Sequence, residues 1–417
     1  KTRRKMKMDI FQKCFDFTRA EETKAAGLYP YFHEITSRQH AEVMIDGRRT
    51  VMLGSNNYLG LTSDDRVIAA AQAALDTFGS GCSGSRYLNG TLSLHNEMER
   101  QLAEFFGKEA AMSFSTGFQT NLGILAGICS YHDNLYMDRM NHASLVDGAR
   151  LSFGKTLKYR HNDMEELEGL LARCPEDRGK LIVVDGVFSM EGDLADLPNI
   201  VRLARQYGAR VLVDDSHGAG VMGKTGRGCG EHFGLMDEID LYMGTFSKSF
   251  ASLGGFVAGK TKVIEYLKHH SRPFIFSASM PPSNVGAVIE ALRILKAEPE
   301  RVARLNGSAD YMRRELSRLG LPIGASVAPI IPILTYFDER TFRITRALLE
   351  RGVYVNPVVS PAVPVGESLV RTSYTATHTR EQLDYALEQF EHVLLREFPI
   401  SEEELAAARA AEEHAEH

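Results

Sequence analysis

Helical and strand-like segments alternate between residues 60 and 300. The helical stretches include VIAAAQAALDTFG, LHNEMERQLAEFFG and NIVRLARQYG, and the short apolar runs between them are EAAMSFS, NLYMD, KLIVVDG, ARVLVDD and DLYMGTFS. Apolar runs of this kind, bounded by polar or glycine residues, are typical of strands buried on both faces. The alternation therefore predicts an α/β fold with a mostly parallel central sheet flanked by helices.

The pattern divides the chain into four parts. Residues 1–58 are expected to form an N-terminal arm and a small strand pair, AEVMIDGRRTVML, that turns at Asp46-Gly47. Residues 59–300 are expected to form the large α/β domain. Residues 301–398 are expected to form a smaller C-terminal α+β domain, and 399–417 an acidic, alanine-rich tail that is either an exposed helix or a disordered end.

Charge and cysteine usage exclude several classes of protein. The net charge is −6 and no basic block stands out, which argues against a nucleic-acid partner. Five scattered cysteines without a C-x-x-C pair argue against a disulfide framework or a metal site, and favour a reducing, cytoplasmic location.

Two features of the sequence concern export and membrane association. The basic start KTRRKMKMDIFQKC is followed by no apolar stretch of a secretory signal, and no run of 18 apolar residues exists. Two interpretations of the basic start stay open: peripheral contact with anionic lipid of the inner membrane, or a solvated, frayed terminus.

Chemically distinctive residues follow the predicted strands, where ligands of open α/β sheets bind. The apolar run LYM leads into MGTFSKSFASLGG, a stretch that contains Lys248 and no acidic residue. Asp214 comes directly after the apolar run VLV, and His217 follows three residues later. Lys248 lies 34 positions after Asp214, which leaves room for one helix and one strand, so both can reach one sheet edge.

These residues match the needs of pyridoxal phosphate, which takes a lysine for its Schiff base and an acid against its ring nitrogen. Lys248 supplies the amine, and a neutral environment favours it because desolvation lowers the pKa of lysine. Asp214 can hold the ring nitrogen protonated, and His217 can hydrogen-bond the phenolic oxygen. The remaining candidates are a ring-stacking histidine and phosphate ligands at a helix start: His142, Gly117, Phe118, Thr245 and Ser247.

Each feature also has an ordinary explanation. Lys248 could be a surface lysine, and His142 a structural histidine. An Asp-x-x-His pattern also occurs in metal-dependent enzymes, and Ser-Thr-Gly-Phe could be a plain helix cap. The glycine-rich stretch GSGCSGSR lacks the G-K-[ST] ending of a P-loop. The order and spacing of the whole set favour the cofactor site.

With this set assembled, the sequence resembles the α-oxoamine synthase family of fold-type I pyridoxal-phosphate enzymes over residues 25–395. The shared motifs are SNNYLGL, GSGCSGSRYLNGT, STGFQTN, NHASLVDG, DGVFSMEGD, VDDSHGAGVMGKTGRG, GTFSKS and FSASMPP. The resemblance implies a homodimer with active sites between subunits, in which Lys248 is the Schiff-base lysine and then the general base. It implies that Ser189 joins His217 at the phenolic oxygen and that Ser277 reaches the phosphate from the partner chain.

The resemblance also implies the substrates. Arg371 matches the arginine that holds the amino-acid carboxylate, and Asn56 an asparagine that helps across the dimer. Ser85, where glycine-specific members carry threonine, leaves space for a substrate side chain. The opening KAAGLYPYFHEITSRQHAEVMIDGRRTVMLGSNNYLGL and the loop NPVVSPAVPVGESLVRTS look most like the bacterial serine palmitoyltransferase branch, although Val358-Val359 stand where some of its soluble members have an extra arginine.

That branch implies condensation of L-serine with a long-chain acyl-CoA, palmitoyl-CoA, giving 3-ketosphinganine, CoA and CO2. Two alternatives stay open. One is another member, of the 8-amino-7-oxononanoate synthase or 2-amino-3-ketobutyrate CoA ligase type, that uses alanine or glycine. The other is a catalytically silent regulatory subunit, against which the presence of Lys248, Asp214, His217 and His142 argues.

Overall fold

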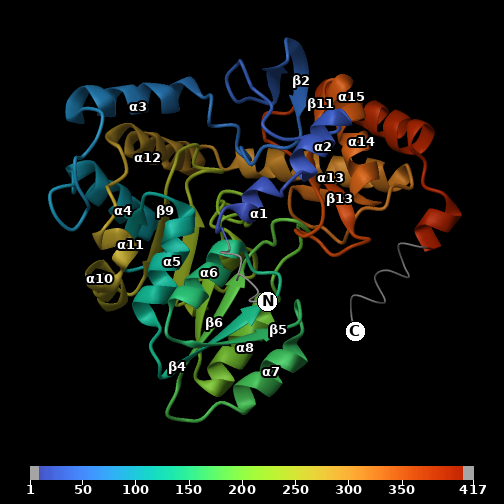
Figure 1. The fold of residues 1–417 in the computed structure, drawn as a ribbon. Coiled ribbons are helices and arrows are strands. Elements are labelled where there is room, and N and C mark those ends of the chain that lie inside the picture. The colour runs from blue at the N-terminus through green and yellow to red at the C-terminus, as the bar shows by residue number, and fades with distance from the viewer. Residues whose placement is uncertain (1–8, 407–417) are drawn as a thin grey trace, which may run out of the picture.

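A seven-stranded sheet forms the centre of the molecule in a computed structural model that describes residues 9–406 (Figure 1). In order across the sheet, its strands are β3 (Ala110–Phe114), β9 (Gly255–Gly259), β8 (Leu241–Thr245), β7 (Arg210–Asp214), β6 (Gly179–Asp185), β4 (Asp133–Asp138) and β5 (Lys155–Tyr159). β9 runs antiparallel to both of its neighbours, and the other pairs are parallel. The predicted mostly parallel α/β sheet is confirmed.

Helices cover both faces of this sheet. One face packs against α5 (Gly117–Ile128), α6 (Ala143–Leu151) and α10 (Thr261–His270). The other carries α3 (Asp65–Phe78), α4 (Ser93–Phe105), α7 (Met164–Ala172), α8 (Leu197–Tyr207) and α12 (Pro282–Ala297). Successive strand residues point to opposite faces, so Val183 belongs to one core and Val184 to the other. Two buried layers of this kind require the apolar strands seen in the sequence.

Local sequence signals explain where the helices begin and end. At the start of α8, Asp196 Oδ1 accepts the N–H of Asn199 at 3.3 Å and a proline occupies the first turn. The helix ends at Gly208, whose φ of 65° suits glycine. α3 begins in the same way, with Asp64 accepting the N–H of Arg66 at 3.0 Å.

The C-terminal part contains a second, antiparallel sheet. Its strand order is β10 (Ile330–Tyr336), β13 (Ser368–Ser373) and β12 (Asn356–Val358). The helices around it are α13 (Glu300–Arg318), α14 (Asp338–Glu350) and α15 (Arg380–Phe390), which continues as a π-helical segment, Glu391–Glu397. The remaining short helices are α1 (Gln12–Phe15), α2 (Arg19–Ala25), α9 (Cys229–His232), α11 (Arg272–Ile275) and a 3-10 turn, Met236–Glu238.

The N-terminal strand pair joins this C-terminal part. β1 (Glu42–Ile45) and β2 (Arg48–Met52) form the predicted hairpin, whose turn residues Asp46 and Gly47 have φ values of 49° and 73°. β2 also pairs in parallel with β11 (Val353–Tyr354), so the blue hairpin lies beside the red C-terminal helices in Figure 1. The N-terminal segment is thereby held against β13 and its neighbours.

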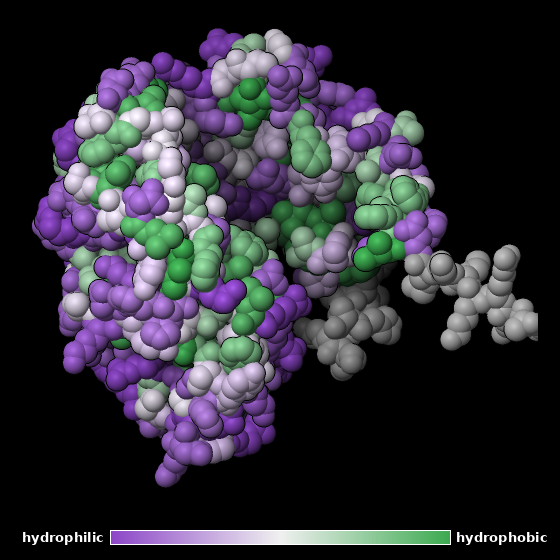
Figure 2. Space-filling view, turned by 60° about the vertical axis from the view of Figure 1, so that its left-hand side comes forward, coloured by the Kyte–Doolittle hydropathy of each residue, from purple (hydrophilic) through white to green (hydrophobic). Residues whose placement is uncertain are grey.

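The chain after β2 crosses the small sheet toward the large one. The N–H of Ser373 donates to the Leu53 carbonyl at 2.7 Å, and the N–H of Ala376 donates to the Tyr58 carbonyl at 2.8 Å. In the space-filling view, the surface is hollowed between the larger and smaller parts of the molecule (Figure 2).

Two expectations about the termini fall partly outside the described residues. Residues 402–406 of the acidic tail are helical, while 407–417 and the basic residues 1–8 lie outside the described part. No helix within residues 9–406 is long and apolar enough to cross a membrane.

Candidate active site

A cavity of about 290 Å³ opens at the carboxyl ends of β6, β7 and β8. This size is near the lower end of small-molecule pockets, roughly 300–1,000 Å³. Among the residues predicted from the sequence, its lining includes Gly117, Phe118, His142, Ser189, Asp214, His217, Thr245, Ser247 and Lys248. Residues distant in the sequence meet here because parallel strands bring their carboxyl ends to one edge.

Lys248 lies in the turn that follows β8, next to the end of β7. Burial lowers the pKa of its amine to about 8, although the carboxylates of Asp214 and Asp185 act in the opposite direction. An amine with this pKa is partly neutral near pH 7, and a neutral amine can act as a nucleophile or a base.

Asp214 ends β7 and is fixed by two donors. Its Oδ2 accepts from Asn121 Nδ2 at 2.6 Å, and its Oδ1 accepts the N–H of Ser216 at 3.0 Å. Asn121 comes from α5, and its Oδ1 has no hydrogen-bond partner within residues 9–406. The carboxylate therefore keeps one orientation at the cavity wall.

A second carboxyl, Asp185, ends β6 directly beside Asp214 in the sheet register. Its Oδ2 accepts the backbone N–H of His142 at 2.7 Å, which positions the start of α6. Burial raises the pKa of Asp185 well above its usual value, and the neighbouring carboxylate of Asp214 raises it further. The buried carboxyl group of Asp185 therefore favours its neutral form.

The two cavity histidines are both held through Nδ1. His217 Nδ1 lies 2.7 Å from the hydroxyl of Tyr58, and His142 Nδ1 lies 2.8 Å from Ser144 Oγ. Burial lowers the pKa of both imidazoles, and the positive charge of Lys248 lowers it further, although the carboxylate of Asp214 acts in the opposite direction on His142. Both rings therefore favour the neutral form, with Nε2 free of these contacts. The His142 ring also lies at the edge of Phe118, with centroids 6.4 Å apart.

A cradle of donors lies where α5 begins. The first N–H groups of a helix lack intrahelical partners, and α5 begins at Gly117. A Cβ at Gly117 would lie 2.6 Å from Thr245 Oγ1, so glycine is needed for this close approach. Thr245 Oγ1 in turn lies 3.0 Å from Ser247 Oγ. Helix N–H groups and hydroxyls in this arrangement suit an anion such as a phosphate.

Arg371, in the middle of β13, is buried behind Ser189. Its Nε donates to the Ser189 carbonyl at 2.5 Å, and Nη2 donates to Asn56 Oδ1 at 3.1 Å and to the Tyr58 hydroxyl at 3.5 Å. All of these partners are neutral. A buried guanidinium normally has a carboxylate or phosphate partner, so Arg371 is suited to receive an anionic ligand.

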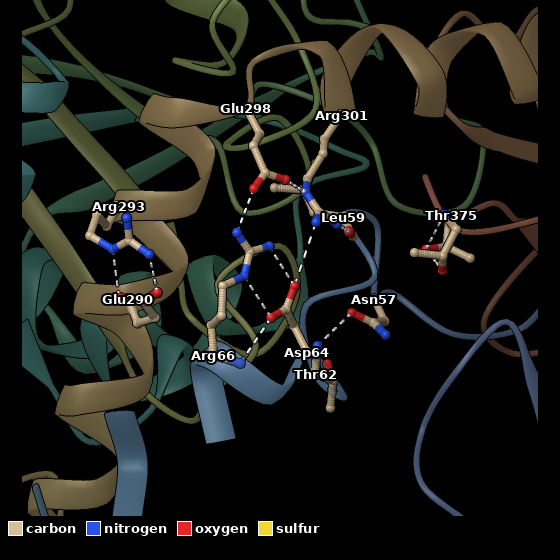
Figure 3. Close-up of polar contacts among 11 residues, drawn as sticks. Asn57, Leu59, Thr62, Asp64, Arg66, Glu290, Arg293, Glu298, Arg301 and Thr375 are labelled. Carbon is tan, nitrogen blue, oxygen red and sulfur yellow. Dashed lines mark hydrogen bonds and ion pairs between the residues drawn. The ribbon is translucent and has the colours of Figure 1, made fainter. Parts of the chain in front are cut away.

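The loop that carries Asn56 and Tyr58 is anchored by an ion network (Figure 3). Arg66 joins Asp64 at 2.8 Å and Glu298 at 2.5 Å, so the start of α3 is tied to the link between α12 and α13. From the other side, Arg301 Nε bonds Glu298 at 2.7 Å, and its Nη1 donates to the Leu59 carbonyl at 3.2 Å. These contacts fix residues 57–66 at the edge of the site.

Other predicted residues do not line the cavity. Ser277 Oγ accepts from Gln119 Nε2 at 3.1 Å outside it, and Ser85 is buried with a hydroxyl that has no partner within residues 9–406. Val358 and Val359 are both buried, and Val358 packs in a small apolar cluster with Val363 and Leu369.

Sequence reasoning overlooked three residues of the site: Asn121, Asp185 and Tyr58. Each lies inside a quoted motif, but the polar contacts that distinguish it join elements far apart in the chain. One available signal was Asn121, a polar residue in the apolar helical run NLGILAG. The others required the sheet order and the path of the N-terminal loop.

The side chains present fit pyridoxal phosphate. A partly neutral lysine, a fixed carboxylate across the cavity and a donor cradle that excludes a side chain at Gly117 correspond to its aldehyde, ring nitrogen and phosphate. Together with the sheet, they define a transferase of the fold-type I class.

The chain belongs to the aminotransferase class I and II family, whose model matches residues 48–390. It is 51% identical to the serine palmitoyltransferase of Sphingobacterium spiritivorum over 384 residues, 92% of this chain and 96% of that one. It is 43% identical to the 8-amino-7-oxononanoate synthase of Thermosipho melanesiensis over 373 residues, 89% of this chain and 95% of that one. A serine palmitoyltransferase solved with pyridoxal phosphate superposes with a TM-score of 0.89 at 36% identity, covering 97% of this chain and all of the other.

Proposed function

We propose that this chain is a pyridoxal-phosphate-dependent acyltransferase of the serine palmitoyltransferase type. It condenses L-serine with a long-chain acyl-CoA, palmitoyl-CoA, to give 3-ketosphinganine, CoA and CO2, the first step of sphingolipid synthesis. The 51% identity to the Sphingobacterium spiritivorum enzyme over almost the whole chain supports this assignment. The structural observation that carries it is Arg371, a buried guanidinium with neutral partners, one of which is Ser189 of the lysine-containing cavity.

When bound, pyridoxal phosphate supplies an electron sink for the negative charge that develops at the amino-acid α-carbon. Lys248 holds the cofactor, and its Nζ then takes the proton from that carbon, which requires a neutral amine. Asp214 would keep the ring nitrogen protonated. His217 and Ser189 would hydrogen-bond the phenolic oxygen, and His142 would stack on the ring.

The phosphate is assigned to the start of α5. Gly117 and Phe118 provide backbone N–H groups, and Thr245 and Ser247 provide hydroxyls. The contacts among these residues support the assignment. Thr245 Oγ1 lies 3.0 Å from Ser247 Oγ, and it lies so close to Gly117 that a Cβ there would be only 2.6 Å away.

The carboxylate of serine is assigned to Arg371, with Asn56 helping to orient it. Asn56 Oδ1 accepts from Arg371 within the same chain, which pre-orders the guanidinium. Because Val358 and Val359 offer no charge, carboxylate binding is assigned to Arg371 and Asn56, with His142 of the cavity lining as a further contact. Ser85 is retained as a residue that leaves room for the serine side chain.

The enzyme is proposed to act as a homodimer in the cytoplasm. The basic N-terminal residues are proposed to make any peripheral contact with the membrane. Ser277, from the partner chain, would complete the phosphate site. Phe276 and Leu88, which are 74% and 76% exposed, are apolar side chains near this segment that a partner would cover. Sedimentation of the purified enzyme tests the dimer. Mixing inactive Lys248→Ala and Ser277→Ala chains tests whether sites are shared.

The deciding experiment is a matrix of amino acids and acyl-CoA thioesters, read by CoA release. We expect L-serine with palmitoyl-CoA to give the highest kcat/KM, and Lys248→Ala to abolish both turnover and the visible absorbance of the lysine-bound cofactor, at roughly 420 nm. Faster reaction of alanine or glycine with another acyl-CoA would support the second candidate, which the 43% identity to 8-amino-7-oxononanoate synthase favours. A colourless wild-type protein would support a silent subunit.

A further inference from the structure

The backbone N–H and the hydroxyl of Ser144 both lie within hydrogen-bond distance of the same nitrogen of His142. It is the N-cap of α6, and the backbone N–H of Ser144 donates to its Nδ1 at 3.2 Å, while Ser144 Oγ lies 2.8 Å from that nitrogen. A backbone N–H can only donate, so Nδ1 must offer its lone pair and carry no proton. The Ser144 hydroxyl therefore also points its proton toward Nδ1.

A hydrogen bond from Asn121 leaves the proton of the Ser144 hydroxyl free for His142. Its Nδ2 lies 2.6 Å from Asp214 Oδ2 and 2.9 Å from Ser144 Oγ. An ionised carboxylate only accepts, so the amide must turn its NH2 group toward Asp214. The second amide proton then goes to Ser144 Oγ, which accepts there and keeps its own proton for His142. Asn121 and Ser144 are each only 1% exposed, so the contacts are shielded from water.

We propose that Asn121 and Ser144 are positioning residues that hold His142 as the neutral tautomer protonated at Nε2. The hydrogen bonds run in one direction, from Asn121 to Ser144 to His142, and the anchor of the chain is Asp214. His142 consequently presents an N–H donor to the cavity and has no basic nitrogen to offer there. Such a donor suits a carboxylate or carbonyl oxygen of a bound substrate.

Burial favours the same state, because it lowers the pKa of His142 and keeps the ring neutral. The inference deepens the proposed function, since it states what His142 offers in that site. The tautomer of His142 is set by hydrogen bonds within the protein, so it can be tested without cofactor, substrate or turnover.

The test is residue-specific modification of the cofactor-free, full-length protein by diethyl pyrocarbonate at neutral pH, with peptide mass spectrometry as the readout. The reagent attacks an imidazole nitrogen with a free lone pair. His269 is the internal reference: it is exposed, and its Nδ1 faces the Glu265 carbonyl at 2.8 Å, so Nδ1 is protonated and Nε2 is free. We expect His142 to react at least about tenfold more slowly than His269, because the lone pair on His142 Nδ1 accepts the hydrogen bonds from Ser144.

Variants separate this tautomer from simple shielding. Ser144→Ala should accelerate modification of His142 about fivefold, the factor commonly associated with one lost hydrogen bond, and Asn121→Ala should do so to a lesser degree. Ser144→Thr, which retains the hydroxyl, should restore the slow rate. Ser152→Ala is the matched control, since its hydroxyl bonds the Ala149 carbonyl at the other end of α6.

A wild-type His142 that reacts as fast as His269 would overturn the proposal, as would Ser144→Ala with an unchanged rate. If Ser144→Ala does not fold, as judged by circular dichroism, the wild-type comparison and Asn121→Ala still decide. Because no substrate is used, failure here leaves the serine assignment standing, and failure of the amino-acid matrix leaves this result standing.

Discussion

The hydroxyl of Tyr58 lies 2.7 Å from Nδ1 of His217, and both side chains are buried. The same hydroxyl lies 3.5 Å from Nη2 of Arg371, which can only donate. The hydroxyl has one proton and two acceptors within reach, His217 Nδ1 at 2.7 Å and Asn56 Oδ1 at 3.3 Å, and the shorter contact favours donation to His217. Tyr58 then accepts from Arg371, and the proton of His217 stays at Nε2. One tyrosine thus connects the residue assigned to the substrate carboxylate with the residue assigned to the cofactor.

Tyr58→Phe is expected to impair the reaction without removing a group that touches the substrate. Nδ1 of His217 would be left buried without a donor, which costs about 1–3 kcal/mol. We expect kcat to fall roughly tenfold and the absorbance spectrum of the bound cofactor to change. Steady-state kinetics and spectra of the holoenzyme measure both. Wild-type kinetics together with a wild-type spectrum would contradict this role.

Arg371→Gln is expected to weaken recognition of the amino acid selectively. Loss of a charge-assisted contact in a buried site is worth about 2–5 kcal/mol, so kcat/KM for serine should fall by about 30-fold or more. The KM for acyl-CoA should stay nearly constant. Arg340→Gln is the matched control, because Arg340 is partly buried and bonds only the Thr335 and Phe398 carbonyls among residues 9–406. Equal losses in the two variants would refute a specific role for Arg371.

The parallel sheet could be predicted because its strands are short, apolar and separated by amphipathic helices. The prediction that Asp214 and Lys248 reach one edge required only that their strands be close, and β7 and β8 are in fact neighbours. The antiparallel strand β9 was not predicted, because Gly-Phe-Val-Ala-Gly has glycine at both ends and resembles a loop. Its strand form depends on pairing with β3 and β8, which are distant in sequence.

The candidate site shows the same limit. Lysine, aspartate and histidine at strand ends could be identified from the sequence, since their chemistry is unusual in those positions. Asp185 becomes distinctive only when β6 and β7 place it beside Asp214. Tyr58 becomes part of the site only because its loop crosses β13. Such tertiary relationships have no local signal in one sequence.

Cofactor capture should depend on pH through Lys248. Its amine has a pKa of about 8 because burial disfavours the charged form. The neutral fraction rises with pH, so about one amine in ten is neutral at pH 7 and most are neutral above pH 9. We expect the rate at which the cofactor-free enzyme binds pyridoxal phosphate to rise between about pH 6 and 9 and then level off. Stopped-flow absorbance measures it. A rate that still climbs about tenfold per pH unit above 9 would indicate an ordinary lysine.

His161 should make the folded protein less stable as the pH rises. Its Nδ1 lies 3.1 Å from Asp138 and its Nε2 lies 2.8 Å from Asp193. Burial alone would lower its pKa, but the two carboxylates raise it to about 10. The unfolded value is about 6.5, so the stabilisation is complete below that pH and is lost as the pH rises toward 10.

His161→Asn removes this clamp between the end of β4 and the loop that carries Ser189. The loss of charge-assisted hydrogen bonds should lower the free energy of unfolding by about 3 kcal/mol at pH 6, and by much less at pH 10. Urea denaturation of both proteins at the two pH values measures the difference. His270→Asn is the matched control, because that exposed ring bonds a carbonyl of its own helix. A destabilisation by His161→Asn that is equal at pH 6 and pH 10 would show that the ring is not held as a cation.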